Sequence, residues 1–498
     1  MSDYRLIADR IAGDIASGRL RPGQRLPPQR VFARRRGIAG STAGRVYAEL
    51  VRRGLVVGEV GRGTFVRAAA AGPYGQAIVE AATGAPVNLE LNYPSAPGQS
   101  ALLAPALAPL LRPDVLTEAL RPAPATGTAA AREAVAELLA TPTWRPDPDR
   151  VLFTGNARQA IAAALASLVR PGGRVGVEPL TYPLVKEIAG RLGVTLVALE
   201  ADGGGLCPES VRSAHRTAPL SALYLQPTLH NPTSVTTGEA RRREIAQVIR
   251  ELGLPVVEDR IWSFLHPDSP DHPSSPNSPS SPDSPDSPDS PDSPDSPDSP
   301  SSLDHPDSPA PLAAHAPGLV HVVDGLSKRV APGLTVGFLV VPEGRVEAVG
   351  VAVRSGGWSA GRFALEAGVR WMTDGTVARL VEAKRADARA RQRLVVEELG
   401  ESGESGEFAV RADPLTYYAW WELPAPWRAD TFTAAAAAHG IAVTPGTAFG
   451  VDPKRTPDAV RLGLASAAVP DLRRALRTLA ALARGAAAGT PVPGGRIG

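Results

Sequence analysis

Residues 318–334 read GLVHVVDGLSKRVAPGL, an apolar strand-like run that leads into Lys328 and a Pro-Gly turn. Lys328 is one of only four lysines in a chain of 498 residues that carries 53 Lys plus Arg. A lysine amine can lose its proton and form a Schiff base with an aldehyde, which a guanidinium cannot do. The stretch therefore indicates either a catalytic lysine or a lysine that simply lies on the surface.

The sequence around this stretch alternates helical and strand-like segments from about residue 88 onward. A helical pattern over 128–140 precedes a short strand over 150–155, a helix over 156–169 and a strand over 174–180. Such alternation predicts an α/β domain with a mostly parallel sheet and flanking helices.

Polar residues follow several of the apolar runs, and ligands bind at such strand ends in open α/β sheets. Gly155-Asn156 precedes a helix whose free N–H groups suit a phosphate. Asn231 lies in LQPTLHNPTS, and Asp259 ends LPVVED. An imine-forming amine, a carboxylate for a ring nitrogen, an amide donor and a phosphate cradle are together what pyridoxal phosphate needs. Each signal is weak by itself, so their joint order carries the prediction.

The N-terminal 66 residues are basic, with 13 Arg against 5 Asp plus Glu. Apolar residues from Leu6 to Ile15 recur at helical spacing, and a second helix follows two prolines. Ser41 or Thr42 can cap a third helix, after which two β-rich runs flank a Gly-rich turn. Three short helices and a β-hairpin predict a winged helix-turn-helix.

This N-terminal sequence resembles the GntR-type DNA-binding domain over residues 4–66. The pattern G-R-L-x-P-G-x-R-L-P, the arginine after it and the wing G-R-G-T-F-V occur in that order. The family usually has Ser-Arg where this chain has Ala39-Gly40, so either the base preference is altered or Arg45 or the arginines at 34–36 supply that contact. The resemblance implies double-stranded DNA as a partner, with Arg30, Ser41, Thr42, Arg45 and Arg62 as DNA-binding residues.

Residues 88–485 resemble the fold-type I aminotransferases, and with the GntR-like head the chain is similar to the MocR-type regulators. This family joins a winged helix-turn-helix to a large α/β aminotransferase-like domain with a smaller C-terminal α/β part, and it uses pyridoxal phosphate for sensing. The resemblance implies Lys328, in S-K-x-x-x-P-G, as the catalytic lysine that holds the cofactor. It implies Asp259 for the pyridine nitrogen and Asn231 for the ring 3-oxygen. The other implied residues are Tyr182, Gly155, Asn156, Ala157 and Ser327 around the cofactor and Arg461, in VRLGLA, for an effector carboxylate.

Three positions depart from the aminotransferase pattern. Thr335 stands where an arginine normally pairs with the cofactor phosphate, and Trp262 replaces a tyrosine three residues after the ring aspartate. The segment RPAPATG lacks the tyrosine that usually reaches the phosphate across a dimer. Losing one charge-assisted phosphate contact costs about 1.5–3 kcal/mol. Arg158 and Arg329 are the candidates to compensate.

Composition sets the domain limits and the compartment. We expect a winged helix over 1–68, a linker over 69–87, the large domain over 88–485 and a disordered tail over 486–498. Within the large domain, 266–309 holds 10 Asp and no Arg or Lys, and its Ser-Pro-Asp repeats predict a disordered insertion rather than a metal site. A single cysteine, Cys207, and the lack of an apolar membrane-length run predict a cytoplasmic protein with no membrane contact.

Three hypotheses fit the sequence. The first is a homodimeric transcription regulator that binds DNA, pyridoxal phosphate and an amino-acid-like effector. The second is an active aminotransferase with an appended DNA-binding domain, and the third is a regulator whose large domain has lost the cofactor. The departures favour the first over the second, because sensing needs only a ligand-dependent change of state. The remaining lysines, Lys186, Lys384 and Lys454, lie in charged text and are interpreted as surface residues.

Overall fold

The computed structural model describes residues 4–16, 19–20, 24–53, 55–59, 63–66, 85–266, 309–334, 336–400 and 408–487. Most of the predicted linker, nearly all of the predicted insertion and most of the predicted tail therefore lie outside the described residues. The same holds for two single positions that matter to the predictions, Arg62 and Thr335.

The N-terminal unit is a winged helix-turn-helix, as predicted. Its helices are α1 (Tyr4–Ala16), α2 (Gln29–Arg36) and α3 (Gly40–Arg52). Its strands β1 (Arg25–Leu26), β2 (Val56–Glu59) and β3 (Gly63–Val66) form an antiparallel sheet in the order β1-β3-β2. Phe32 and Tyr47 meet edge to face, with ring centroids 5.4 Å apart, in a core that joins the three helices to the hairpin.

Two details of this unit differ from the sequence-based expectation. Leu6 is 67% exposed, because the inner face of α1 is formed by Ala8 and Ile11 instead. Helix α3 begins at Gly40 with Ala39 as its N-cap, so neither Ser41 nor Thr42 caps it. Both residues lie within the first turn of α3, where their side chains are available for contacts outside the helix.

The large sheet has seven strands in the spatial order β5-β13-β12-β11-β10-β6-β7. All neighbours from β12 to β7 are parallel, whereas β13 runs antiparallel to both β12 and β5. The mostly parallel sheet is therefore confirmed. The strands are β5 (Val151–Thr154), β6 (Arg174–Val177), β7 (Thr195–Ala198), β10 (Ala222–Leu225), β11 (Val256–Asp259), β12 (Val320–Gly325) and β13 (Gly337–Val340).

Helices cover both faces of this sheet, which explains why its strands read as nearly continuous apolar runs. Along β11, Val256 belongs to one core cluster and Val257 to the cluster on the opposite face. One face is covered by α7 (Ala157–Leu168), α8 (Pro183–Arg191) and α13 (Val346–Ser355). The other is covered by α6 (Ala129–Leu139), α9 (Pro208–Thr217), α10 (Glu239–Leu252), α11 (Leu312–His315) and α14 (Arg362–Thr373).

Short elements connect and flank these layers. They are α4 (Gln99–Leu107), η1 (Ala108–Leu111), α5 (Pro113–Ala119), η2 (Pro148–Arg150), β8 (Ala201–Asp202), β9 (Gly205–Leu206), η3 (Ser263–Leu265) and α12 (Leu326–Arg329). Helix α12 carries Lys328 and directly follows strand β12.

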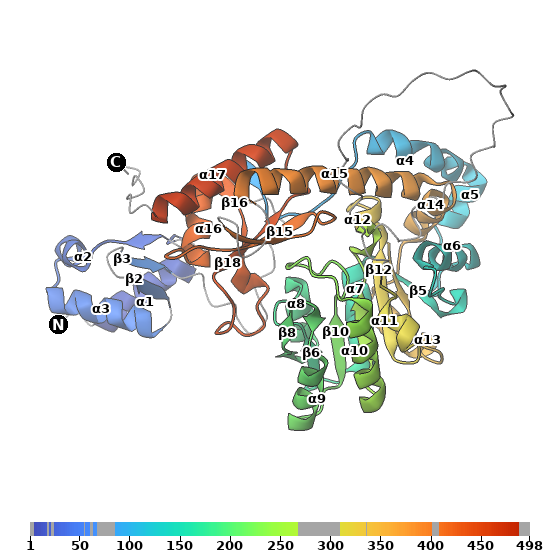
Figure 1. The fold of residues 1–498 in the computed structure, drawn as a ribbon, viewed down its shortest axis with the longest axis horizontal. Coiled ribbons are helices and arrows are strands. Elements are labelled where there is room, and N and C mark those ends of the chain that lie inside the picture. Colours follow the sequence, from blue (N-terminus) through green and yellow to red (C-terminus); the bar gives the residue numbers. More distant parts are fainter. Residues whose placement is uncertain are drawn as a thin grey trace, which may run out of the picture.

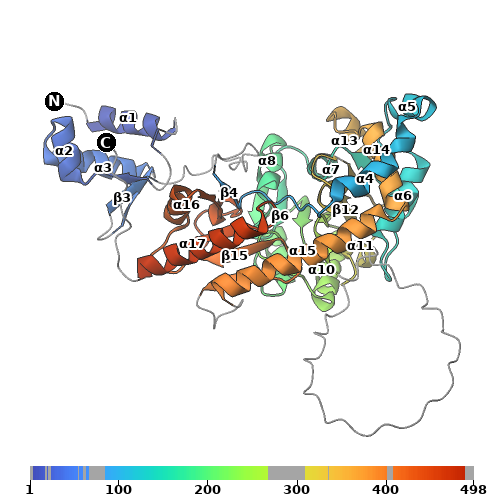
Figure 2. The same cartoon turned by 90° about the horizontal axis from the view of Figure 1, so that it is seen from above.

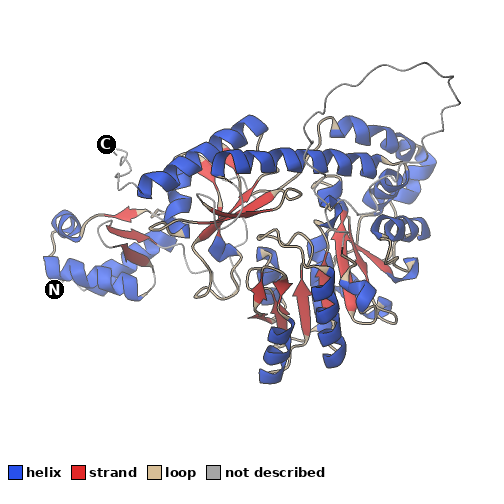
Figure 3. Ribbon diagram, viewed as in Figure 1, coloured by secondary structure: helices blue, strands red, loops and turns tan. Residues whose placement is uncertain are grey.

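The C-terminal part is a second, smaller α/β layer, shown by element type in Figure 3. Its antiparallel sheet has the order β14-β15-β18-β17, and the short strand β16 pairs with β4. The strands are β4 (Val87–Asn88), β14 (Ala409–Ala412), β15 (Tyr418–Glu422), β16 (Ile441–Ala442), β17 (Thr444–Pro445) and β18 (Ala459–Gly463). The helices are α15 (Thr376–Leu399), α16 (Ala429–Ala438), η4 (Gly446–Ala448) and α17 (Val469–Ala487).

The 24-residue helix α15 runs along the molecule from the large sheet to the C-terminal part (Figure 1). Seen from above, the winged helix lies beside the C-terminal part, at the end away from the large sheet (Figure 2). Within the described part of the chain, none of the helices combines the length and apolar character that crossing a membrane requires.

Candidate cofactor and effector site

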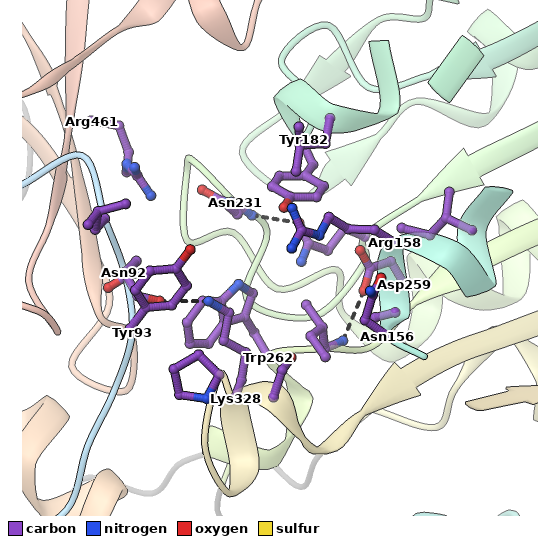
Figure 4. Close-up of a pocket in the computed structure, with 18 of the residues that line it drawn as sticks. Asn92, Tyr93, Asn156, Arg158, Tyr182, Asn231, Asp259, Trp262, Lys328 and Arg461 are labelled. Carbon is purple, nitrogen blue, oxygen red and sulfur yellow. Dashed lines mark hydrogen bonds between the residues drawn. The ribbon is translucent and has the colours of Figure 1, made fainter. Parts of the chain in front are cut away.

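A cavity of about 380 Å³ lies where the large sheet meets the C-terminal part (Figure 4). The structure brings most of the predicted site residues together here, because strands β11 and β12 and helix α7 all end or begin at this edge. The predicted residues that line the cavity are Asn156, Ala157, Tyr182, Asn231, Asp259, Ser327, Lys328 and Arg461. Gly155 is not among the lining residues, and its N–H donates to the Trp358 carbonyl at 2.9 Å.

Lys328 projects from α12 into the cavity, where it is half-buried. Its Nζ donates to the backbone carbonyl of Asn92 at 2.7 Å. The ring centroids of Tyr93 and Trp262 lie 4.6 Å and 5.2 Å from the same Nζ, within the range of cation–π attraction. The surface interpretation of this lysine is therefore excluded, and its amine lies inside a polar and aromatic enclosure.

Asp259 ends β11 with its carboxylate almost fully buried. Oδ2 accepts the Tyr224 hydroxyl at 2.7 Å, and Oδ1 accepts the Ile261 N–H at 3.0 Å. Burial raises the pKa of Asp259 to about 6, while these two hydrogen bonds oppose the rise. A buried carboxylate of this kind is suited to bind a cationic ring nitrogen, which would replace the solvation it has lost.

Asn231 and Tyr182 lie beside each other on the cavity wall (Figure 4). The Asn231 backbone N–H donates to Gln226 Oε1 at 2.9 Å, which fixes the loop after β10. The side-chain Oδ1 of Asn231 is buried and has no hydrogen-bond partner in the described structure. An unpartnered buried acceptor is costly, so the Asn231 amide has hydrogen-bonding capacity left for a ligand; its nitrogen is the atom able to donate to a ring oxygen.

Helix α7 points its N-terminus at the cavity. Asn156 is the N-cap, and its Oδ1 accepts the Gln159 N–H at 3.0 Å. Strand β13 passes so close that a Cβ on Gly337 would lie 2.3 Å from the Asn156 carbonyl carbon, so only glycine fits there. First-turn N–H groups carry a positive partial charge and bind anions such as phosphate.

The two arginines proposed to compensate at the phosphate end are placed differently. The Arg158 side chain extends from α7 into the cavity beneath Tyr182 (Figure 4). Arg329 is buried beside the ring of Phe264 and donates to Asp324 Oδ2 at 2.7 Å, outside the cavity lining. Compensation by Arg329 is therefore wrong, because its guanidinium is committed to Asp324, whereas Arg158 stays a candidate.

Arg461 comes from β18 of the C-terminal part and lies across the cavity from Arg158 (Figure 4). It donates to the Glu90 carbonyl and to Thr444 Oγ1, and its guanidinium carbon lies 5.5 Å from the Phe449 ring centroid. Burial lowers the pKa of Arg461 to about 10, so it remains charged at neutral pH. A buried guanidinium at this position can bind a carboxylate.

Trp262 occupies the position at which the aminotransferase pattern has tyrosine. Its ring is buried against Tyr418, with centroids 5.6 Å apart, and faces Lys328. It fills the space of a phenol without providing a phenolic oxygen. Thr335, where the family pattern has arginine, lies outside the described residues.

Sequence reasoning missed several residues that shape the cavity. Glu90, Asn92 and Tyr93 line it from the segment after β4, which carries no recognisable motif and is brought here by the pairing of β4 with β16. Lys384 was predicted to lie on the surface, and this is wrong: it is 0% exposed and donates to three carbonyl oxygens beneath α12. Its charged neighbours concealed this, because only the tertiary fold shows which face of α15 is buried.

Lys186 is also not a free surface lysine. It is half-buried, and its Nζ donates to the carbonyls of Ala448 at 2.9 Å and Gly450 at 2.8 Å. Of the three lysines interpreted as surface residues, Lys454 is the exposed one.

The candidate DNA-binding residues lie on the outer faces of α2 and α3. Arg30, Ser41 and Arg45 are exposed, and Thr42 is half-buried. Arg53 at the end of α3 is instead tied to Asp9 and Glu49, by hydrogen bonds of 2.5 Å and 2.8 Å. The exposed arginines of α2 and α3 thus offer charge to phosphates.

The cavity residues fit pyridoxal phosphate. The set comprises an amine, a buried carboxylate, an amide whose nitrogen can donate, a helix N-terminus with a nearby arginine, and an aromatic ring at Tyr182. Lys328 would hold the aldehyde end, Asp259 the ring nitrogen and Asn231 the ring oxygen, with α7 and Arg158 at the phosphate.

Comparisons with known proteins agree with this architecture. The model of aminotransferase class I and II matches residues 117–479, and that of bacterial regulatory proteins of the gntR family matches residues 3–66. The uncharacterized HTH-type transcriptional regulator YdeF of Bacillus subtilis is 27% identical over 395 residues, which cover 79% of this chain and 76% of that protein. A second one, YdfD of the same organism, is 23% identical over 500 residues, covering 96% and 95%.

Solved aminotransferases share the fold of the large domain. The α-aminoadipate aminotransferase LysN from Thermus thermophilus, complexed with N-(5'-phosphopyridoxyl)-L-leucine, superposes with a TM-score of 0.66 at 21% identity, covering 82% of this chain and 94% of that chain. An archaeal alanine:glyoxylate aminotransferase gives a TM-score of 0.66 at 18% identity, covering 80% and 90%. The chain therefore belongs to the class I and II aminotransferase family, and its gntR-family domain gives it the architecture of the MocR-type transcription regulators.

Proposed function

We propose that this protein is a transcription regulator that binds DNA through its winged helix and senses pyridoxal phosphate together with an amino-acid-type effector. The observation that carries the proposal is the meeting of Lys328, Asp259 and Asn231 with Arg461 in one cavity, in a chain that also carries a gntR-family domain. When bound, pyridoxal phosphate would supply an aldehyde that can condense with a lysine amine with loss of water, and Lys328 is the residue that would meet it.

In this proposal the large sheet and the C-terminal part bind different groups. The large sheet would bind the cofactor through Lys328, Asp259 and Asn231, and the C-terminal part would bind the effector carboxylate through Arg461. Because the effector would touch both parts, its binding would favour one arrangement of the large sheet and the C-terminal part over others. The winged helix lies beside the C-terminal part, so such a rearrangement is in a position to reach the DNA-binding surface (Figure 2).

A homodimer is part of this proposal. Two winged helices held at a fixed distance would read two half-sites, as symmetric regulators do. Leu111 and Leu120, which flank α5, are 64% and 70% exposed, and burying them against a second copy would remove apolar surface from water. Sedimentation equilibrium of the full chain tests this part of the proposal: a monomer at micromolar concentration would contradict it.

DNA binding is tested by selecting fragments of the source genome with the full chain and measuring affinity by fluorescence anisotropy at fixed salt. Arg45→Ala should weaken binding about tenfold and lower the salt slope by about one, because one phosphate or base contact is lost. Arg216→Ala is the matched control, since Arg216 is 70% exposed and lies on α9, outside both the winged helix and the proposed dimer surface. If both variants bound DNA with the same affinity and salt slope, α3 would not be the helix that contacts DNA.

Sensing is tested by repeating the titration with pyridoxal phosphate and a panel of α-amino acids. At least one amino acid should change DNA affinity when the cofactor is present, and Arg461→Lys should abolish that response while the protein still binds cofactor. A DNA affinity that no combination of cofactor and amino acid changes would overturn the sensing function.

Aminotransferase turnover is the second candidate, supported by the presence of Lys328, Asp259 and Asn231 in one cavity. Trp262 counts against it, because it has no phenolic oxygen to hold the ring oxygen during repeated turnover. Sustained formation of 2-oxo acid in excess of enzyme would favour this candidate over sensing.

A further inference from the structure

Lys384 is a buried lysine that lies directly beneath the turn carrying Lys328. Its Nζ donates to the carbonyl oxygens of Lys328 at 3.0 Å, Arg329 at 2.9 Å and Val330 at 2.7 Å. The side chain is 0% exposed and is not part of the cavity lining. Lys384 therefore acts on the backbone of the Lys328 turn from behind, without access to a ligand.

Three acceptors match the three N–H groups of an ammonium, whereas a neutral amine has only two. Burial lowers the pKa of Lys384 to about 7, and the three carbonyl dipoles oppose that shift because they bind the charged form. The contact is thus built for a cation, and an apolar residue of similar length would leave three buried carbonyls without this donor.

The turn that Lys384 supports has little stability of its own. Helix α12 has only four residues, and the carbonyls at the end of a helix have no partner within it. Immediately after it, Val330 leaves the helical conformation, with φ −105° and ψ −81°. A basic side chain at a helix C-terminus satisfies such carbonyls and interacts favourably with the helix dipole.

Lys384 itself stands on a firmly held element. The Tyr417 hydroxyl donates to the Lys384 carbonyl at 2.7 Å. Farther along α15, Gln392 Nε2 donates to the carbonyls of Thr416 at 2.8 Å and Tyr418 at 3.0 Å. Helix α15 is therefore fixed to the C-terminal part and can serve as a reference for the position of α12.

We propose that Lys384 is the positioning residue of Lys328, holding the α12 turn so that the Lys328 amine meets the aldehyde of a bound cofactor. This inference rests on the proposed function and deepens it. Without Lys384 the turn shifts, so the covalent attachment of Lys328 weakens while the non-covalent contacts of Asp259 and Asn231 persist. A purely structural role would instead weaken both kinds of contact alike.

The test compares two ligands on the full chain, pyridoxal phosphate and 4'-deoxypyridoxine 5'-phosphate, which lacks the aldehyde. Lys384→Met should lower affinity for pyridoxal phosphate by about tenfold or more, because orientation of the amine is lost. Affinity for the deoxy compound should stay within about twofold of the wild type. Borohydride reduction followed by mass spectrometry gives a second readout: the yield of cofactor fixed to Lys328 should fall in the variant.

Lys186→Met is the matched control, because Lys186 also donates to backbone carbonyls from a half-buried position but does not touch α12. It should affect the two ligands equally. Circular dichroism of the cofactor-free variants checks folding. If Lys384→Met does not fold, Lys384→Gln, which keeps two N–H donors, is compared in the same way and should show a smaller loss confined to pyridoxal phosphate.

Equal losses for both ligands, or no loss for either, would overturn the positioning role while leaving the proposed function intact. A wild-type protein that binds neither ligand would instead defeat the proposed function, and the inference with it.

Discussion

The two ends of the cavity have diverged to different degrees. At the proposed ring end, Lys328, Asp259 and Asn231 line the cavity. Tyr224 and Ile261 donate hydrogen bonds to Asp259, and the Asn231 N–H donates one to Gln226. At the proposed phosphate end, the sequence has Thr335 where the family pattern has arginine, and helix α7 has Asn156 as its N-cap and Arg158 in its first turn. The three groups proposed to identify and attach the ring are present, with Trp262 as the one departure beside them, whereas more of the proposed phosphate anchors differ from the family pattern.

This difference fits a sensor better than a catalyst. A catalyst gains from a permanently bound cofactor, whereas a sensor of the cofactor needs an affinity near the concentration it reports. Weakening the phosphate end lowers affinity without changing which molecule is recognised. Four predictions test this division of roles.

The largest effect is expected from Lys328→Ala. Removing the amine eliminates covalent attachment, so affinity for pyridoxal phosphate should fall by about 100-fold or more. Equilibrium dialysis measures it. Affinity for 4'-deoxypyridoxine 5'-phosphate, which has no aldehyde, should hardly change. A similar loss of affinity for both ligands would mean that Lys328 does not act by covalent attachment.

Asp259→Asn should act on affinity and stability in opposite directions. Losing the partner of the ring nitrogen should weaken cofactor binding by about 10- to 100-fold. The cofactor-free protein should become more stable, because a carboxylate whose pKa burial raises to about 6 is ionised at neutral pH at a cost. Thermal unfolding with and without cofactor measures both, and a variant destabilised in both states would contradict the assignment.

Arg158→Ala should lower affinity by roughly tenfold, the value of one charge-assisted phosphate contact. The loss should be absent for pyridoxal, which has no phosphate, and isothermal titration of both compounds measures it. Thr335→Arg, which restores the residue of the family pattern, should recover affinity in the Arg158→Ala background. If affinity does not recover, the absence of an arginine at position 335 is not the cause of weak phosphate binding.

The smallest effect is a pH dependence at the ring end. Asp259 in the cofactor-free protein has a pKa of about 6, so it becomes protonated as the pH falls through that value and no longer offers a negative charge to the ring nitrogen. Affinity should therefore be about fourfold lower at pH 5.5 than at pH 7.5. Asp259→Asn removes this contribution and serves as the control for titration of the cofactor itself. Identical pH profiles would exclude Asp259 as the source.

The fold and most of the residues proposed to bind the cofactor ring could be predicted from the sequence, because each depends on a short local pattern. Strand ends followed by Asn156, Asp259 or Lys328 can be read without knowing the tertiary structure. The arrangement around Lys328 could not be predicted, since Asn92 and Tyr93 arrive through the pairing of β4 with β16, more than 350 residues away along the chain.

Local rules also failed at two places. Ser41 and Thr42 are good capping residues, yet α3 begins earlier, at Gly40. The sequence around Lys384 has the charge of an exposed helix, yet α15 lies between the large sheet and the C-terminal part, so one face of it is buried. For Lys384 the decisive information is which face of α15 the neighbouring elements cover, whereas the structure gives no packing reason for the start of α3.

The central claim is that Lys328 attaches pyridoxal phosphate covalently. The most direct measurement is the visible absorption spectrum of the full chain titrated with pyridoxal phosphate, recorded in parallel for Lys328→Ala. We predict a saturable new band in the wild type, absent from the variant, that borohydride abolishes while leaving the cofactor fixed to Lys328 by mass spectrometry. No band at saturating cofactor, or the same band in Lys328→Ala, would contradict the claim.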